Sequence, residues 1–162
     1  MSRRSSGAHD RGFTLVELVA VMAIVGILSV VAGPRFFSTE RFAARGFAED
    51  ARVGLRYARA LAVASGCAVG FSASATGYSV HRWLGGAGCN DLAGSRVPVA
   101  RPGGGQYLGR APTDVSVQAF DVVFDAIGRP RAGSDGTLLT APSDFTVGVH
   151  HLTVEPETGL VR

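Results

Sequence analysis

The sequence predicts an α+β protein in which a long N-terminal helix packs on a C-terminal antiparallel β-sheet domain. Three observations predict this class. An apolar run covers residues 13–32, and apolar side chains then recur at helical spacing over residues 36–64. After Gly66 apolar and polar residues alternate, as they do in strands. All the strands follow the helix, which is the order of an α+β chain.

Composition excludes several classes of protein. The chain has 162 residues, of which 46% are hydrophobic and 18% charged, and this excludes wholesale disorder. Only one apolar run is long enough to cross a bilayer, which excludes a polytopic membrane protein. The net charge is +3, and two of these charges fall within residues 1–12. The rest of the chain is therefore nearly neutral and gives little reason to expect a polyanionic partner.

Residues 13–34 are predicted to form a transmembrane helix behind a polar, basic leader at residues 1–12. A helix of this length spans about 30 Å, the thickness of a bilayer core. The arginine-rich flank predicts a cytoplasmic N-terminus. Pro34 is expected to interrupt the helix because proline lacks an N–H and clashes with the preceding turn. Glu17 is the only charged residue between Phe13 and Ala32 and needs a partner in an apolar setting.

Three interpretations of this segment compete. A secretory signal peptide would use Val30-Val31-Ala32 as its cleavage site, but its apolar region would be too long and would hold a carboxylate. That interpretation would release a soluble enzyme. A plain membrane anchor explains the length and leaves Glu17 unexplained. The third interpretation rests on the residues that precede Glu17 and explains both.

Gly12-Phe13-Thr14-Leu15-Val16-Glu17 resembles the processing motif of type IV pilins and type II secretion pseudopilins. The resemblance implies that prepilin peptidase cleaves between Gly12 and Phe13 and methylates the new amine of Phe13. It also implies that Glu17 neutralises this amine, on its own or a neighbouring chain, during assembly. Pro34 falls on the helix-interrupting proline of the family, and Gly26 on a common mid-helix glycine.

Five later segments carry a second resemblance: Arg35-Phe36-Phe37, Ala44-Arg45-Gly46-Phe47, Leu55-Arg56-Tyr57-Ala58, residues 62–67 and residues 124–130. They are similar to the GspH/FimT branch of minor pilins, and most similar to MshC-type minor pilins of mannose-sensitive haemagglutinin (MSHA) pili. The resemblance implies a type IV pilin-like fold and a structural subunit that enters or primes a pilus for adhesion or motility. Alternatives are a GspH-like type II secretion pseudopilin and a DNA-binding minor pilin, with nucleic-acid contacts at Arg129, Arg131 and Arg162.

The same resemblance implies the partners and the location. The chain would sit in a bacterial inner membrane as a single-pass protein, with its C-terminal domain in the periplasm, before it moves into a pilus or pseudopilus. Its partners would be membrane lipid, prepilin peptidase, other minor and major pilins, and an inner-membrane assembly platform.

Residues 35–65 are predicted to form an amphipathic helix that ends at Ser65-Gly66. Its arginine-rich outer face is interpreted as a solvated surface rather than a phosphate-binding strip. One stripe carries the apolar residues Phe47, Ala51, Leu55, Ala58 and Ala62.

Residues 66–162 are predicted to form the globular β domain. A hairpin pairs residues 67–72 with residues 77–84 and places Val69, Phe71, Tyr78 and Val80 in the core or facing it. Residues 84–105 are expected to form a long irregular loop. Further strands are expected at residues 115–118, 120–125, 137–140, 145–155 and 160–162, with turns at residues 127–130 and 156–159.

Cys67 and Cys89 are the only cysteines. Outside the cytoplasm they are expected to form a disulfide, and the alternative is two buried or free thiols. Redox catalysis lacks support because no C-x-x-C motif is present.

No catalytic, metal-binding or cofactor-binding motif is found, so the sequence predicts neither an enzyme nor a cofactor. His150 and His151 are adjacent in a predicted strand and would point to opposite faces, which disfavours a shared metal. Asp121 and Asp125 alternate as a solvated strand face would.

Overall fold

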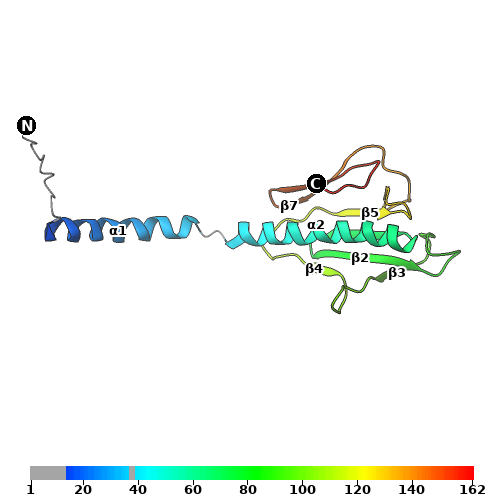
Figure 1. Cartoon of the computed structure of the whole chain (residues 1–162), viewed down its shortest axis with the longest axis horizontal. Helices are drawn as coiled ribbons and strands as arrows, with labels where there is room; N and C mark the ends of the chain where they lie inside the picture. Colours follow the sequence, from blue (N-terminus) through cyan, green and yellow to red (C-terminus); the bar gives the residue numbers. More distant parts are fainter. Residues whose placement is uncertain (1–13, 37–38) are drawn as a thin grey trace, which may run out of the picture. The chain divides into compact units, whose positions relative to one another are not determined.

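The computed structural model describes residues 14–36 and 39–162, which fall into two compact units, Met1–Ser38 and Thr39–Arg162. Helix α1 (Leu15–Phe36) belongs to the first unit (Figure 1). Helix α1 continues through Pro34 to Phe36, two residues beyond the expected interruption, and residues 37–38 lie outside the described residues. Proline removes one backbone N–H from the helix ladder but holds a helical φ, so the chain can remain helical beyond it.

Helix α2 (Thr39–Ser65) begins the second unit and buries the predicted stripe. Leu55, Ala51, Ala58 and Ala62 are fully buried, and Phe47 is 5% exposed, which confirms the helical spacing. The helix ends at Ser65, before Gly66, whose φ of 66° is the left-handed value common just after a helix.

The main sheet is antiparallel, with strand order β3-β2-β1-β5-β6, and β4 also pairs with β2. The predicted hairpin is present as β1 and β2, with Phe71 opposite Val80. The strands are β1 (Val69–Ser74), β2 (Gly77–Leu84), β3 (Ser95–Pro98), β4 (Leu108–Arg110), β5 (Phe120–Phe124) and β6 (Pro130–Ala132).

A separate two-stranded sheet pairs β7 (Ser143–Val147) with β8 (His150–Val154). The single strand expected at residues 145–155 is therefore wrong. The chain turns at Gly148, whose φ is 56°, and Val149 in this turn is 78% exposed. A valine lies on each side of Gly148, so the apolar pattern of the sequence gives no sign of the turn.

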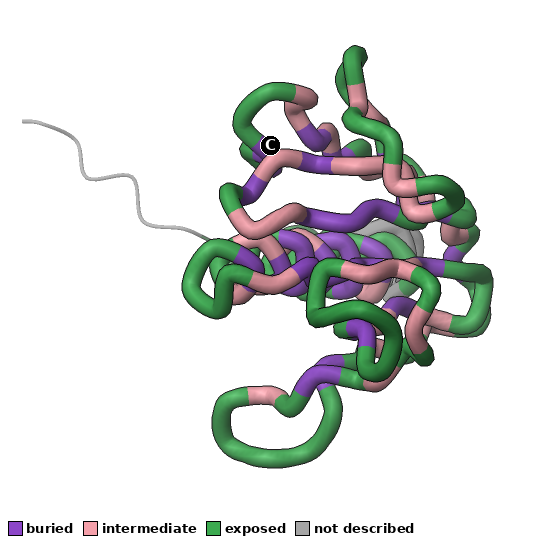
Figure 2. Tube along the Cα trace, turned by 90° about the vertical axis from the view of Figure 1, so that its right-hand side faces the viewer, coloured by how far each residue is buried: buried purple, intermediate pink, exposed green. Residues whose placement is uncertain are grey.

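Two apolar clusters hold the second unit together. Figure 2 marks the buried positions along the chain in purple. The larger one lies between α2 and the sheets, and Phe145 and Leu152 of the β7–β8 hairpin contribute to it. It also contains Val69, Phe71, Tyr78 and Val80, as predicted. The smaller cluster joins Ala68, Trp83 and Val123 on the other face of the main sheet, with Leu92 packed against it.

The remaining strand predictions need correction. The expected irregular loop at residues 84–105 contains β3, which pairs with β2. Strands β4 and β6 were not predicted, and β6 falls partly on the expected turn at residues 127–130. No strand forms at residues 137–140, where Leu138 makes only an isolated bridge to Arg131. The unpredicted strands are three or four residues long and carry proline or glycine, so they lack the alternation that identifies a strand.

Candidate functional site

The start of α1 is capped by the side chain of Thr14. Its Oγ1 accepts a hydrogen bond from the backbone N–H of Glu17 at 3.2 Å, and its carbonyl accepts one from Leu18 at 3.2 Å. A threonine followed three residues later by glutamate is the pattern of a capping box. Glu17 also lies in the first turn, where a carboxylate interacts favourably with the helix dipole. This capping role was not predicted from the sequence, although the Thr14–Glu17 spacing indicates it.

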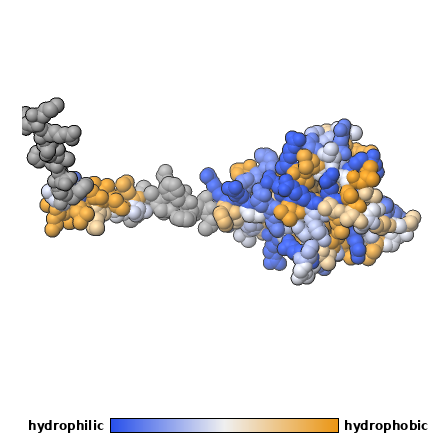
Figure 3. Space-filling view, viewed as in Figure 1, coloured by the Kyte–Doolittle hydropathy of each residue, from blue (hydrophilic) through white to orange (hydrophobic). Residues whose placement is uncertain are grey.

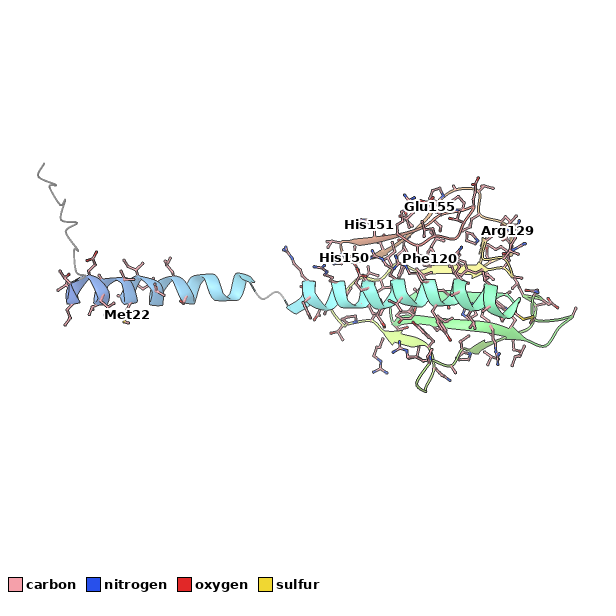
Figure 4. All side chains as sticks on the ribbon, in the orientation of Figure 1. Met22, Phe120, Arg129, His150, His151 and Glu155 are labelled. Atoms are coloured by element: carbon pink, nitrogen blue, oxygen red, sulfur yellow. A yellow bond between two sulfur atoms is a disulfide. The ribbon has the colours of Figure 1, made fainter. Side chains whose placement is uncertain are left out.

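The side chains of α1 from Leu15 to Ser29 are exposed, and most of them are apolar (Figure 3). Leu15 is 79% exposed, and Met22, labelled in Figure 4, is 67% exposed. A contiguous apolar surface of this kind marks a site of contact with protein or lipid. The other exposed large apolar residues of α1 are Val16, Leu18, Val19, Val21, Ile24, Val25, Ile27 and Leu28.

Among the residues that the structure describes, no helix combines the length and apolarity needed to cross a membrane.

The predicted processing residues lie outside the described residues. Gly12 and Phe13 precede Thr14, the first described position. Pro34, which was expected to assist assembly, lies within α1.

Cys67 and Cys89 are joined in a disulfide, with their Cα atoms 5.2 Å apart. The bridge fastens the loop after β2 to the segment that follows α2. Two hydrogen bonds flank it: the carbonyl of Cys89 accepts from Ala68 N–H at 3.2 Å, and Asn90 Nδ2 donates to the carbonyl of Gly66 at 3.2 Å. The loop is therefore held at one end of the sheet.

Arg129 and Arg131 share one carboxylate, that of Asp125. Arg129 Nη2 lies 3.0 Å from Asp125 Oδ2, and Arg131 Nη2 lies 3.4 Å from it. Asp125 Oδ1 accepts backbone hydrogen bonds from Ile127 and Arg129 at 3.1 and 2.9 Å. Burial raises the pKa of Asp125, but the N–H donors and the guanidinium of Arg129 outweigh burial and hold this pKa below its ordinary value.

The third predicted arginine pairs with a different carboxylate. Arg162 is 71% exposed at its side chain and lies 3.5 Å from Glu155 Oε1. Figure 4 shows Arg129 beyond the end of β5 and Glu155 on the segment that follows β8. The structure thus brings Arg129 and Arg131 together and gives Arg162 a separate partner.

The other singled-out polar residues do not form a reactive site. Asp121 pairs with Arg96 at 2.9 Å, whereas Asp125 pairs with Arg129. His150 and His151 follow each other on β8 (Figure 4), and consecutive strand residues face opposite sides. Within residues 14–36 and 39–162, no group of three or more potential ligands is placed to hold a metal ion.

The outer face of α2 is largely exposed, as expected, but two of its arginines also bind the C-terminal segment. Arg56 Nη2 donates to the carbonyl of Val161 at 3.0 Å, and Arg59 Nε donates to the carbonyl of Thr158 at 2.8 Å. These two arginines attach the C-terminal segment to α2. Sequence spacing alone could not identify contacts between positions about a hundred residues apart.

A buried histidine was also missed. His81 is 3% exposed, and its ring centroid lies 5.0 Å from that of Trp83. Among the described residues, His81 Nε2 has no hydrogen-bond partner. Burial and the nearby charge of Arg96 lower the pKa of His81. Alternation along β2 could have indicated the position of His81. Val80 faces the core under α2, so its neighbour His81 faces the other side of the sheet.

Residues 7–33 match the family described as the prokaryotic N-terminal methylation motif. This motif is a type IV pilin-like prepilin signal, and it supports a type IV pilin or pseudopilin. It points to a structural protein rather than an enzyme, and it implies processing by prepilin peptidase and assembly with other pilins. No curated protein and no solved structure matches the chain.

Proposed function

We propose that this chain is a minor subunit of a type IV pilus of MSHA type, serving adhesion or motility. The observation that carries this proposal is the methylation motif at residues 7–33, which includes most of helix α1, whose described side chains are exposed and mostly apolar. The α+β architecture, in which α2 packs against an antiparallel sheet, is consistent with a pilin-like fold.

In this proposal the chain begins as a single-pass inner-membrane protein, with residues 1–12 in the cytoplasm and the β domain in the periplasm. Prepilin peptidase removes residues 1–12 and methylates Phe13. An assembly platform then transfers residues 13–34 from lipid into a bundle of pilin helices. A helix that is apolar all round suits both surroundings.

During assembly the carboxylate of Glu17 neutralises a positively charged N-terminal amine. Cleavage after Gly12 creates a positively charged amine on Phe13, four residues before Glu17 in the sequence. An opposite charge stabilises an ionised carboxylate in an apolar setting, whether the amine belongs to the same chain or to a neighbour. The exposed position of Glu17 in the first turn of α1 leaves its side chain accessible to such a partner.

Intact mass spectrometry of the mature protein from its native host tests the proposal. A chain that begins at N-methylated Phe13 is the expected result. A chain that begins at Gly33 would show that ordinary signal peptidase released it, and it would overturn the pilin assignment.

A minor pseudopilin of a type II secretion system is the alternative, because it shares the same processing and helix physics. Deleting the gene distinguishes the two machines. Loss of surface pili with secretion intact supports the pilus, whereas loss of protein secretion with pili intact supports the pseudopilus.

Nucleic acid is the less favoured partner. Arg129 and Arg131 are both paired with Asp125, and Arg162 is paired with Glu155. A DNA-binding minor pilin would show DNA retardation that weakens steeply with added salt. We expect no such retardation for the full-length chain.

A further inference from the structure

We propose that a hollow beside β5 and β6 binds a carboxylate group that carries a small aliphatic substituent. The hollow has a volume of about 380 Å³, within the range of small-molecule sites. It lies in the second unit and contains no residue of α1, so the inference does not depend on pilus assembly.

The positive side of the hollow is formed by Arg129 and Arg131, whose side chains are 41% and 34% exposed. They share a single carboxylate, Asp125, which is only 13% exposed, so the group carries one positive charge in excess. Each guanidinium has five N–H donors, and the contacts to Asp125 and to the Gly136 carbonyl use only some of them. A second carboxylate would complete the charge balance.

The two guanidiniums are held in place before any ligand arrives. Asp125 is itself fixed by backbone hydrogen bonds from Ile127 and Arg129, and Arg131 Nη1 donates to the carbonyl of Gly136 at 3.1 Å. Fixed donors lose little conformational entropy on binding, which favours affinity. Planar guanidinium groups also match the geometry of a carboxylate.

The remaining lining is largely apolar. Ala68 and Val123 are buried members of the smaller apolar cluster, and Leu92 packs against them. Ile127 lies on the rim and is 67% exposed. Ala68 and Val123 are already buried, so a ligand gains free energy of apolar burial from covering the accessible parts of Leu92 and Ile127, which a bare inorganic anion does not gain.

Asn90 and Leu92 belong to the loop that the disulfide fastens, so the cross-link helps to hold this wall of the hollow. The bridge at Cys67–Cys89 immediately precedes these residues, and Asn90 donates to the carbonyl of Gly66. The site therefore joins two parts of the chain, the disulfide loop and the β5–β6 turn.

The same features disfavour a polyanion. Phosphate-backbone binding draws affinity from several free cations, whereas this hollow has an excess of one. A carboxylate next to an aliphatic group occurs both at the C-terminus of a peptide and in a free short-chain acid. The experiment separates these two sources.

The test uses isothermal titration calorimetry on the full-length chain in a mild non-ionic detergent. The probes are N-acetyl-Ala-Leu with a free carboxylate, the same dipeptide as its C-terminal amide, and 3-methylbutanoate. We expect saturable binding of the free dipeptide and binding weaker by about tenfold or more for the amide, since a charge-assisted hydrogen bond is lost. If 3-methylbutanoate binds as tightly as the free dipeptide, a short-chain acid is sufficient as the ligand. If the free dipeptide binds and 3-methylbutanoate does not, the ligand is a peptide C-terminus.

Three variants locate the binding. Arg131→Met removes one guanidinium and is expected to weaken binding of the free dipeptide by about tenfold. Ile127→Glu places a carboxylate on the exposed rim and is expected to abolish binding without disturbing the core. Arg96→Met is the matched control, because Arg96 is 45% exposed and also paired with an aspartate, but lies outside this hollow.

Five results would overturn the proposal. Two concern the probes: equal binding of the dipeptide and its amide, and no saturable binding of any probe. Two concern the variants: an equal loss of affinity in Arg96→Met and Arg131→Met, and unchanged binding in Ile127→Glu. The fifth is displacement of the dipeptide at low salt by a short DNA duplex that binds more tightly, which would assign the arginines to nucleic acid.

Discussion

His81 is a titratable side chain buried on the face of the main sheet that α2 does not cover. Gly70 lies directly opposite it on β1, and a side chain at Gly70 would collide with the ring. Nδ1 of His81 lies 3.5 Å from Ser72 Oγ, at the outer limit of a hydrogen bond. The neutral imidazole is therefore the form that this site accommodates.

The lowered pKa of His81 predicts a loss of stability in mild acid. The unfolded chain binds a proton near pH 6.5, while the folded chain resists protonation, so the free energy of unfolding falls as the pH drops below that value. His81→Phe keeps a ring beside Trp83 and is expected to reduce this decline between pH 7 and pH 5. Urea unfolding at each pH measures it.

His151→Gln is the control, because His151 is exposed on β8. Its pH profile should match that of the unmodified chain. A profile of His81→Phe with the full original decline would show that another group titrates.

Helix α2 illustrates which features of an element can be predicted from its sequence. Its boundary and its buried stripe follow from apolar spacing and from Gly66, both of which are local. The glycine at position 54 is explained by packing between the helix and the sheet. A Cβ there would lie 3.0 Å from the ring of Tyr78, so glycine permits the helix to approach the sheet closely. Only the packed structure shows this.

Truncation of the stripe should destabilise the second unit. Leu55 is fully buried between α2 and the sheet, so Leu55→Ala is expected to lower the free energy of unfolding by about 2–5 kcal/mol. Val53→Ala, at a position that is 53% exposed on the same helix, is expected to change it by less than about 1 kcal/mol. Chemical denaturation of the two variants checks this, and similar losses in both would contradict the assigned helix face.

Removal of the disulfide should also destabilise this unit. The two cysteines are 22 residues apart, and a cross-link across such a loop contributes about 3 kcal/mol in the chain-entropy treatment. The Cys67→Ser/Cys89→Ser double variant should therefore unfold at lower denaturant concentration. Adding a reductant should shift the original chain to the same midpoint and leave the variant unchanged. Equal unfolding midpoints for the oxidised chain and the double variant would contradict a stabilising contribution of the disulfide.

The whole molecule consists of two units with different surfaces, an apolar exposed helix and a domain with its own core. This division predicts that a change in α1 alters assembly while the domain keeps its stability. Glu17→Gln removes the charge proposed to pair with the amine of Phe13. We expect correct cleavage, unchanged unfolding of the domain and loss of the chain from sheared pili, detected by immunoblotting.

Glu40→Gln provides a matched control, since Glu40 is also an acidic residue in the first turn of a helix. It should enter pili normally. Normal incorporation of Glu17→Gln would contradict the proposed role of this carboxylate.

The sequence by itself determined the order of helix and strands, the buried stripe of α2, the β1–β2 hairpin and the methylation motif. Each depends on periodicity or spacing between residues that are close in the chain. The Cys67–Cys89 disulfide was expected because these are the two cysteines of the chain, and the structure contains it. The pairing of β3, β4 and β6 and the sharing of Asp125 by two arginines required the folded structure. The strand pairings join segments that are separated in the chain, while the shared carboxylate depends on how one turn orients its side chains. Neither leaves a periodic signal.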